Sequence, residues 1–246
     1  MEQANNLKVK VFADGADKDG MLAMHGKPFV KGFTTNPTLM RKAGITDYEA
    51  FAKDILSTIK DYPISFEVFS DDFAEMKKQA LKIASWGENV YVKIPVTNTK
   101  GETCYDMVRE LAAAGVKQNV TALFTLEQVQ AVTDALSNGP AANISVFAGR
   151  IADTGVDCLD IMKKSLDIMR PYPQLELIWA SPRELYNVVQ ADEIGCHIIT
   201  VTNSIIDKLS LLGKDLSEYS LETVKMFYQD ATAAGYKIDT EEAVSA

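Results

Sequence analysis

Residues 85–95 read SWGENVYVKIP, and this stretch carries the pattern that decides the fold. The end of a helix-like segment runs into a glycine, and a short apolar strand follows at once. Residues 113–123 (AAGVKQNVTAL) and 193–202 (EIGCHIITVT) repeat the pattern, which is typical of helices that end at a C′ glycine. The sequence therefore indicates repeated units of strand, loop and helix.

Eight short apolar segments rich in β-branched residues recur along the chain, with stretches of helical spacing such as residues 71–85 and 156–170 between them. Strands that alternate with helices favour a parallel sheet, because parallel neighbours need a crossover connection. The predicted strands are residues 8–13, 29–34, 64–69, 90–96, 117–124, 144–149, 176–181 and 197–202.

Eight such units in 246 residues match an α/β fold of the closed (β/α)8 type, the TIM barrel. An open doubly wound sheet is the alternative, but residues 12–17 (FADGAD) lack the G-x-G-x-x-G loop that usually follows its first strand. We expect one domain over residues 1–246, with the barrel at about 8–225 and an extra C-terminal helix and tail at 226–246.

Composition excludes several classes of function. A formal net charge of -9 argues against nucleic acid and anionic lipid as partners, and no apolar run approaches the roughly 18 residues of a membrane span. The first residues resemble no secretory leader, so we expect a cytoplasmic protein. Three scattered cysteines and two histidines, His25 and His197, are poor material for a metal site or a Ser-His-Asp triad.

Lys93 is the strongest candidate for a catalytic residue. In a barrel the working groups lie at the carboxyl ends of the strands, and Lys93 stands in an apolar strand between Val92 and Ile94. Lysine is rarely buried without a partner or a task, and desolvation favours the free amine that attacks a carbonyl. The alternative is a structural ion pair of Lys93 with Glu67 or Asp14.

Two carboxyl groups follow the same logic. Glu67 lies inside an apolar strand, which suits a proton shuttle that works through water, although it could equally be the counter-ion of Lys93. Asp14 ends the first strand, and its alternative role is to cap the next helix, a role that Asp17 could also fill.

Polar residues also end the other strands. Arg150 and Arg183, with the Ser181 hydroxyl, could hold a phosphate, although Arg183 could instead be a charge on a helix face. The remaining candidates are Asn36, Asn119, Thr121 and Ser145.

Seven collinear segments resemble the transaldolase family, within a group that includes the fructose-6-phosphate aldolases. They are FADGAD (12–17), GFTTNPTLM (32–40), SFEVF (65–69), VYVKIPVT (90–97), NVTALFT (119–125), SVFAGRIAD (145–153) and WASPRE (179–184).

The resemblance implies a role for each candidate. Lys93 would form the Schiff base, Asp14 would be the acid/base at the C4 hydroxyl, and Glu67 with Thr121 would activate a water. It further implies that the substrate is held by Asn36, Asn119, Ser145, Phe147, Arg150, Ser181 and Arg183.

Two positions distinguish the branches of this family. Glu67 and Phe147 resemble transaldolases, where the aldolase branch has glutamine and tyrosine. Residues 226–238 (MFYQDATAAGYKI) resemble a compact branch whose last helix packs on a neighbouring subunit, which implies a homo-oligomer, either a dimer or a ring-type pentamer or decamer.

The resemblance thus predicts transfer of a dihydroxyacetone unit between sugar phosphates, without a metal or an organic cofactor. Three alternatives stay open: an aldolase of the fructose-6-phosphate type, a transaldolase acting on a 6-deoxy-6-sulfo ketose, and a barrel that binds a sugar phosphate without turning it over.

Overall fold

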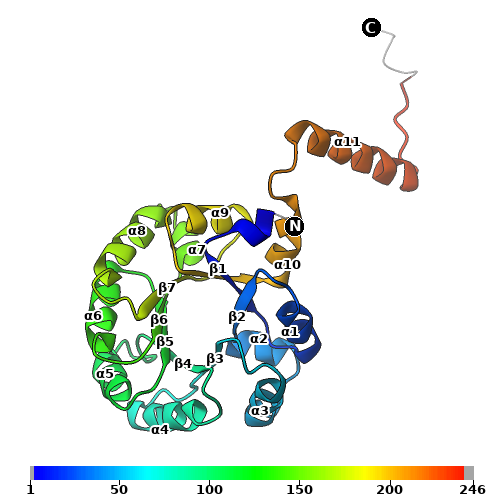
Figure 1. The fold of residues 1–246 in the computed structure, drawn as a ribbon. Helices are drawn as coiled ribbons and strands as arrows, with labels where there is room; N and C mark the ends of the chain where they lie inside the picture. The colour runs from blue at the N-terminus through cyan, green and yellow to red at the C-terminus, as the bar shows by residue number, and fades with distance from the viewer. Residues whose placement is uncertain (1–2, 241–246) are drawn as a thin grey trace. The chain divides into compact units, whose positions relative to one another are not determined.

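The strands form a closed parallel barrel with helices around it, as the repeated units predict (Figure 1). The computed structural model of the chain describes residues 3–240. Strand order follows chain order, and β8 pairs with β1 to close the ring, so the open doubly wound alternative is wrong. The strands are β1 (Lys10–Asp14), β2 (Val30–Thr34), β3 (Ile64–Glu67), β4 (Val90–Pro95), β5 (Gln118–Leu123), β6 (Ala142–Val146), β7 (Leu175–Trp179) and β8 (Ile198–Thr202).

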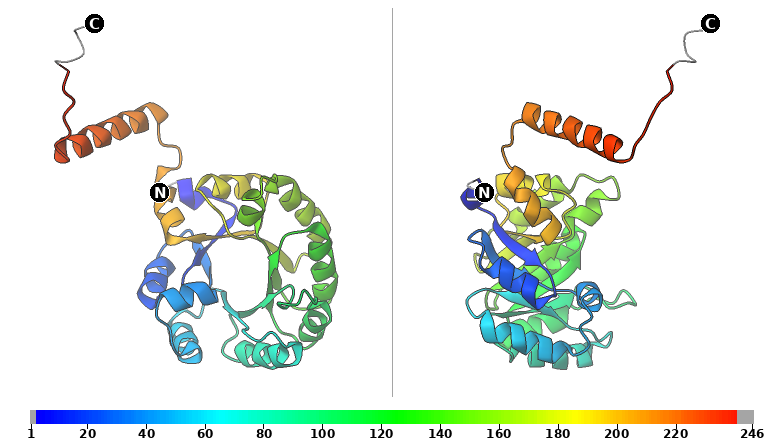
Figure 2. Two further views of the ribbon diagram at one scale, coloured as in Figure 1. Left: turned by 180° about the vertical axis from the view of Figure 1, so that it is seen from behind. Right: turned by 90° about the vertical axis from the view of Figure 1, so that its right-hand side faces the viewer.

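Figure 2 shows the same ring from behind, again with the strands inside and the helices outside, together with a side view of the chain. The helices within residues 3–211 are α1 (Lys18–His25), α2 (Pro37–Lys42), α3 (Tyr48–Thr58), α4 (Phe73–Ala84), α5 (Tyr105–Ala113), α6 (Leu126–Leu136), α7 (Ala148–Ala152), α8 (Cys158–Met169), α9 (Tyr186–Glu193) and α10 (Asn203–Ile206), with 3-10 helices η1 (Gln3–Asn6) and η2 (Asp207–Leu211).

The glycine pattern that predicts the units holds at two of its three positions. Gly115 and Gly195 adopt positive φ angles of 79° and 74° just after α5 and α9, where a side chain would be strained. Gly87 does not adopt a positive φ: α4 ends at Ala84 with Ser85 as its C-cap, so Trp86 occupies the C′ position and Gly87 lies one residue beyond it. The prediction of a C′ glycine is therefore wrong for α4.

Several predicted strands run past the observed ends, and the strand predicted at residues 144–149 does so by the most residues. The apolar run at residues 144–149 suggests a strand, but β6 ends at Val146 and Phe147 leaves the extended region with φ −83° and ψ 59°. The N–H of Ile151 donates to the carbonyl of Phe147 at 3.0 Å and starts α7. Arg150 therefore lies on a short helix and not in the loop just past the strand.

The chain divides into two compact units, Met1–Leu209 and Ser210–Ala246. The second contains α11 (Leu216–Ala233), which starts ahead of the expected boundary at residue 226 because Asp215 caps it, accepting from the N–H of Glu218 at 2.9 Å. Residues 241–246 of the expected tail lie outside the described residues. Among residues 3–240, no helix combines the length and hydropathy that a membrane crossing requires.

Candidate active site

Lys93 lies inside the barrel at the level of two other predicted site residues. The register pairs Glu67 of β3 with Lys93 of β4, and Lys93 with Asn119 of β5. Side chains alternate along a strand, so the fully buried Val92 and Ile94 lie on the opposite face of β4 from Lys93. Lys93 is 8% exposed, and its Nζ donates to the carbonyl of Thr35 at 3.0 Å.

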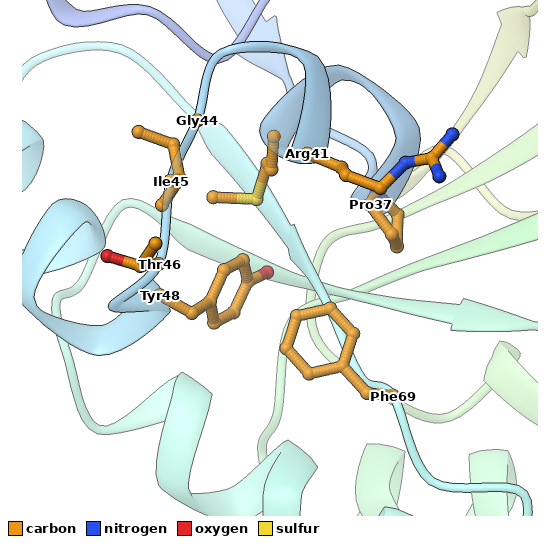
Figure 3. A pocket seen from close by; sticks show the side chains of 8 residues that line it. Pro37, Arg41, Gly44, Ile45, Thr46, Tyr48 and Phe69 are labelled. Atoms are coloured by element: carbon orange, nitrogen blue, oxygen red, sulfur yellow. The ribbon is translucent and has the colours of Figure 1, made fainter.

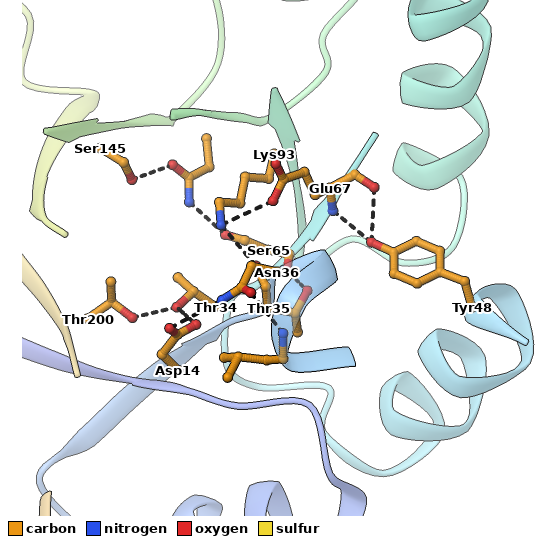
Figure 4. A network of polar contacts seen from close by, with 12 residues as sticks. Asp14, Thr34, Thr35, Asn36, Tyr48, Ser65, Glu67, Lys93, Ser145 and Thr200 are labelled. Atoms are coloured by element: carbon orange, nitrogen blue, oxygen red, sulfur yellow. Dashed lines mark hydrogen bonds and ion pairs between the residues drawn. The ribbon is translucent and has the colours of Figure 1, made fainter. Parts of the chain in front are cut away.

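The carboxylate of Glu67 is the acidic partner of this amine. Its Oε2 lies 3.3 Å from the Nζ of Lys93, and Figure 4 shows the two side chains directed at each other across neighbouring strands. The ion pair that the sequence left as a structural alternative therefore exists. It also places a proton acceptor within reach of a nucleophilic nitrogen, so the geometry is compatible with both roles.

Asp14 forms a second acidic position at the end of β1. It accepts from the Thr34 hydroxyl at 2.9 Å and from the Asn36 amide at 3.4 Å, while Thr34 also shares a short hydrogen bond with the Thr200 hydroxyl. Burial raises the pKa of Asp14, although the charge of Lys93 and these two hydrogen bonds lower it. Asp14 is thus held by Thr34 and Asn36 at a position where the charge of Lys93 acts on it.

Helix capping separates the roles of the neighbouring polar residues. Asp17, and not Asp14, caps α1 by accepting from the N–H of Gly20 at 2.8 Å. Asn36 caps α2 through its Oδ1, which accepts from the N–H of Leu39 at 2.9 Å, so only its amide nitrogen faces Asp14.

The predicted amide Asn119 is fully buried and held from both sides. The Ser145 hydroxyl donates to its Oδ1 at 2.7 Å, and its Nδ2 donates to the Ser65 hydroxyl at 3.0 Å. Thr121 is 3% exposed, and its hydroxyl has no hydrogen-bond partner among residues 3–240. A buried hydroxyl of this kind normally needs a partner, so Thr121 is suited to binding a water or a substrate hydroxyl.

The loops after β6 and β7 meet through a glycine. A Cβ at Gly149 would lie 1.7 Å from the carbonyl oxygen of Ser181, and no side chain fits there. Ser181 itself adopts φ 59°, a conformation that few residues with side chains tolerate. This close approach brings the segments of Arg150 and Arg183 together at the carboxyl ends of β6 and β7.

The two arginines of this segment differ in their surroundings. The guanidinium of Arg150 lies over the Phe147 ring, 5.2 Å from its centre. Arg183 precedes α9, so it is not a charge on that helix face, and its Nε donates to Oδ1 of Asp153 at 3.1 Å while its Nη2 pairs with Oδ2. Asp153 therefore offsets one of the two positive charges.

Sequence reasoning missed several residues of the site. Thr34 and Ser65 lie two positions before Asn36 and Glu67, so the alternation of a strand was a usable signal for both. Asp153 lies three residues after Arg150, and this spacing is a weaker indication that Asp153 belongs to the site. Thr200 and Tyr48 reach the site only through the fold.

A pocket of about 330 Å³ lies beside this polar cluster, between α2, the segment that joins α2 to α3, and Phe69 (Figure 3). Its lining includes Pro37, Met40, Ile45 and the ring of Tyr48. The pocket is mainly apolar, whereas the residues that gather around Lys93 are polar.

Comparison with known proteins gives consistent matches. A family model described as Transaldolase/Fructose-6-phosphate aldolase matches residues 11–244. A "Probable transaldolase" of a Thermoanaerobacter species is 34% identical over 231 residues, covering 94% of this chain and 100% of that protein. A "Probable transaldolase 2" of Listeria monocytogenes is 35% identical over 202 residues, covering 82% and 88%.

Solved structures support the fold. The 3-keto-L-gulonate-6-phosphate decarboxylase of Vibrio cholerae matches with a TM-score of 0.55 at 10% identity, covering 80% of this chain and 89% of that one. A protein described as "QR15, an Aldolase" matches with a TM-score of 0.52 at 12% identity, covering 78% and 89%. At such identities the likeness concerns the barrel alone.

Proposed function

The chain belongs to the transaldolase/fructose-6-phosphate aldolase family, and from this premise we propose that it is a transaldolase working through a Schiff base on Lys93. It would move a three-carbon dihydroxyacetone unit from fructose 6-phosphate or sedoheptulose 7-phosphate to an aldose phosphate. The observation that carries the proposal is the buried Lys93 amine, 3.3 Å from the Glu67 carboxylate at the carboxyl end of the barrel.

In the first stage, Lys93 attacks the C2 carbonyl of the ketose and forms a carbinolamine. Glu67 gives up the proton it has taken from the amine, so that the C2 hydroxyl leaves as water and an iminium ion forms. The unpartnered hydroxyl of Thr121 is suited to holding the water that carries these protons.

In the second stage, the carboxylate of Asp14 takes the proton of the C4 hydroxyl. The C3–C4 bond breaks, its electron pair moves into the iminium, and an aldose phosphate leaves. The three-carbon enamine that stays on Lys93 then attacks the aldehyde of a second aldose phosphate, and the same steps run in reverse.

The other predicted residues would bind the substrate. Asn119 on β5, Ser145 on β6 and Asn36 at the start of α2 would present amide and hydroxyl groups to the substrate. Ser145 and Ser65 already fix the Asn119 amide, which reduces the entropy lost when a sugar hydroxyl binds. Arg150, Ser181 and Arg183 would hold the phosphate, with Phe147 beneath the Arg150 guanidinium.

Borohydride reduction with fructose 6-phosphate tests this proposal. Peptide mass spectrometry should find a three-carbon adduct on Lys93, and its absence would contradict the mechanism. Adding erythrose 4-phosphate should yield sedoheptulose 7-phosphate. Release of free dihydroxyacetone would instead indicate an aldolase, and tight phosphate binding without any adduct would indicate a binding barrel.

Phe147 offers a test of the branch. If Phe147 and Glu67 favour transfer, Phe147→Tyr should increase the release of free dihydroxyacetone relative to transfer. An unchanged ratio would contradict the assignment of Phe147 as a determinant of the branch.

One observation favours a second donor class, a 6-deoxy-6-sulfo ketose. Because Asp153 offsets the charge of Arg183, the side chains of Arg150, Arg183 and Asp153 together carry one net positive charge. A sulfonate carries a single negative charge, whereas a phosphate monoester carries about 1.5 to 2 at pH 7. Comparing kcat/KM for sulfofructose and fructose 6-phosphate distinguishes the donors.

We further propose a homo-oligomer in which α11 packs on another copy of the chain. No residue of α11 is buried, and its exposed apolar side chains include Leu221, Val224, Phe227 and Tyr228. Val224→Glu with Phe227→Glu should lower the mass measured by light scattering, whereas Lys225→Glu on the same helix should not. A monomeric wild type would contradict this assembly.

The proposal places the enzyme in the cytoplasm and in the pentose phosphate pathway, whose sugar phosphates are the substrates named above. Fractionation of cells and the accumulation of sedoheptulose 7-phosphate after deletion of the gene would test these two points.

A further inference from the structure

The backbone groups at the edge of β3 that faces β2 pair with that side of the barrel at Pro63 and Ser65, but not at Glu67. In a parallel pair, alternate residues direct both backbone groups at the same neighbour. Along this edge Phe33 donates to the carbonyl of Pro63 at 2.9 Å, and Thr35 donates to that of Ser65 at 3.2 Å. Glu67 is the next residue in the series, so its N–H and C=O also face β2.

The residues after β2 do not supply those partners. The carbonyl of Thr35 accepts from Nζ of Lys93 instead, and Asn36 caps α2. Pro37 begins that helix and has no N–H to donate. Without another group, the backbone of Glu67 would have two unpaired polar atoms at the point where its side chain meets Lys93.

Tyr48, at the start of α3, fills this gap. Its hydroxyl accepts from the N–H of Glu67 at 2.7 Å and donates to the carbonyl of Glu67 at 3.0 Å, as the two dashed lines in Figure 4 show. One phenol thus takes the place of the missing strand at both backbone groups of a single residue.

The ring that carries this hydroxyl is itself held. Edge-to-face contacts join Tyr48 to Phe69 at 4.4 Å, to Trp86 at 5.8 Å and to Phe66 at 6.1 Å between ring centres. Burial raises the pKa of Tyr48, so the hydroxyl keeps the proton that it donates.

We propose that Tyr48 is a positioning residue for Glu67: by binding both backbone groups of Glu67, it fixes the direction from which the carboxylate meets the Lys93 amine. This role rests on the proposed Schiff-base chemistry. It differs from a merely structural role, because its effect on the reaction passes through one carboxylate.

Tyr48→Phe keeps the ring and removes only the hydroxyl. A displaced proton shuttle can reduce the rate by about 100-fold for a shift near 1 Å, so we expect kcat to fall about 10- to 100-fold. The rate of borohydride trapping on Lys93 should fall with it, whereas KM for fructose 6-phosphate should stay within about twofold, since the phosphate-binding segment is untouched. Tyr62→Phe is the matched control, because Tyr62 contacts His25 and Phe33 and should leave both rates unchanged.

A double-mutant cycle with Glu67→Gln separates positioning from structure. If Tyr48 acts through the carboxylate, Tyr48→Phe should change the residual trapping rate less than twofold in the Glu67→Gln background. An equal loss in both backgrounds would overturn the proposal. A wild type that forms no adduct would refute the Schiff base, whereas a wild type that forms the adduct with a fully active Tyr48→Phe would refute the role of Tyr48 alone.

Hydrogen exchange on the wild type covers the case in which Tyr48→Phe does not fold. The N–H of Glu67 should exchange as slowly as the neighbouring strand amides, although no strand pairs with it there. Exchange as fast as that of a loop amide without a hydrogen bond would mean that the contact is absent and would overturn the proposal.

Discussion

The Lys93 amine and the Glu67 carboxylate form an ion pair inside the barrel, with side chains only 10% and 17% exposed. Adjacent strands place them side by side, because the register pairs the two residues directly. A charge removed from water is costly unless its partner is present, so each side chain offsets the cost of burying the other.

Lys93→Met should abolish adduct formation and should also destabilise the fold. It leaves the Glu67 carboxylate without its cation, and breaking a buried pair in this way costs about 3 kcal/mol. Adding Glu67→Gln should restore most of the free energy of unfolding, measured by chemical denaturation, without restoring activity. The exposed pair Lys77 and Glu110 provides the control, because Lys77→Met should change stability by less than about 1 kcal/mol. A Lys93→Met chain as stable as wild type would contradict the prediction.

Asp14→Asn should eliminate the cleavage step while it stabilises the fold at neutral pH. Burial raises the pKa of Asp14 above 3.8, so ionisation of this carboxyl costs folding free energy as pH rises through the raised value. The gain of Asp14→Asn over wild type should therefore be present at pH 7 and should vanish below pH 3.8, as followed by denaturation across pH. The pH at which wild-type kcat/KM falls on the acid side should lie above the ordinary carboxyl pKa of 3.8.

Asp61→Asn is the control for this prediction, because its effect on stability should have the opposite dependence on pH. A hydrogen bond from His25 lowers the pKa of Asp61, so Asp61→Asn should lose stability at pH 7 and match wild type in acid. The same direction for both variants would show that the shift at Asp14 is not the cause.

Gly149→Ala should weaken substrate binding. The new methyl group would meet the carbonyl of Ser181 at 1.7 Å, so α7 must move from the loop after β7. We expect KM for fructose 6-phosphate to rise about tenfold and the free energy of unfolding to fall by about 1 to 3 kcal/mol, as overpacking usually costs. Gly26→Ala is the control, because its methyl group would be 3.8 Å from the carbonyl of Ala23 and should be tolerated. An unchanged KM would exclude this junction from substrate binding.

Asn36→Ser should separate the two roles of Asn36. Serine is as good an N-cap as asparagine, so α2 and the thermal midpoint should be nearly preserved. The amide donor to Asp14 is lost, and we expect kcat/KM to fall by about tenfold, as one lost hydrogen bond to a charged group permits. Asp72→Ser changes the cap of α4 in the same way and should leave kcat/KM unchanged. Loss of folding in Asn36→Ser would mean that the cap dominates.

The sequence predicted the barrel because its repeat is local. Apolar runs such as residues 90–96 and the helical spacing between them depend only on neighbouring residues, so strand bounds fall within a few positions of the structure. The errors in the predicted bounds occur where local signals compete. The apolar run at 144–149 continues past Phe147, where the chain turns into α7. Gly87 suggests a helix end, but α4 ends before it at Ala84.

The local sequence also identifies the unusual residues, since a lysine or a glutamate in an apolar strand stands out from its neighbours. What these residues contact depends on how the chain folds. Register sets Glu67 against Lys93, the turn of β2 into α2 leaves the Glu67 backbone open, and α3 brings Tyr48 to it from 19 positions away. Such contacts depend on the exact placement in space of residues that are distant in the sequence, which no local pattern of residues specifies.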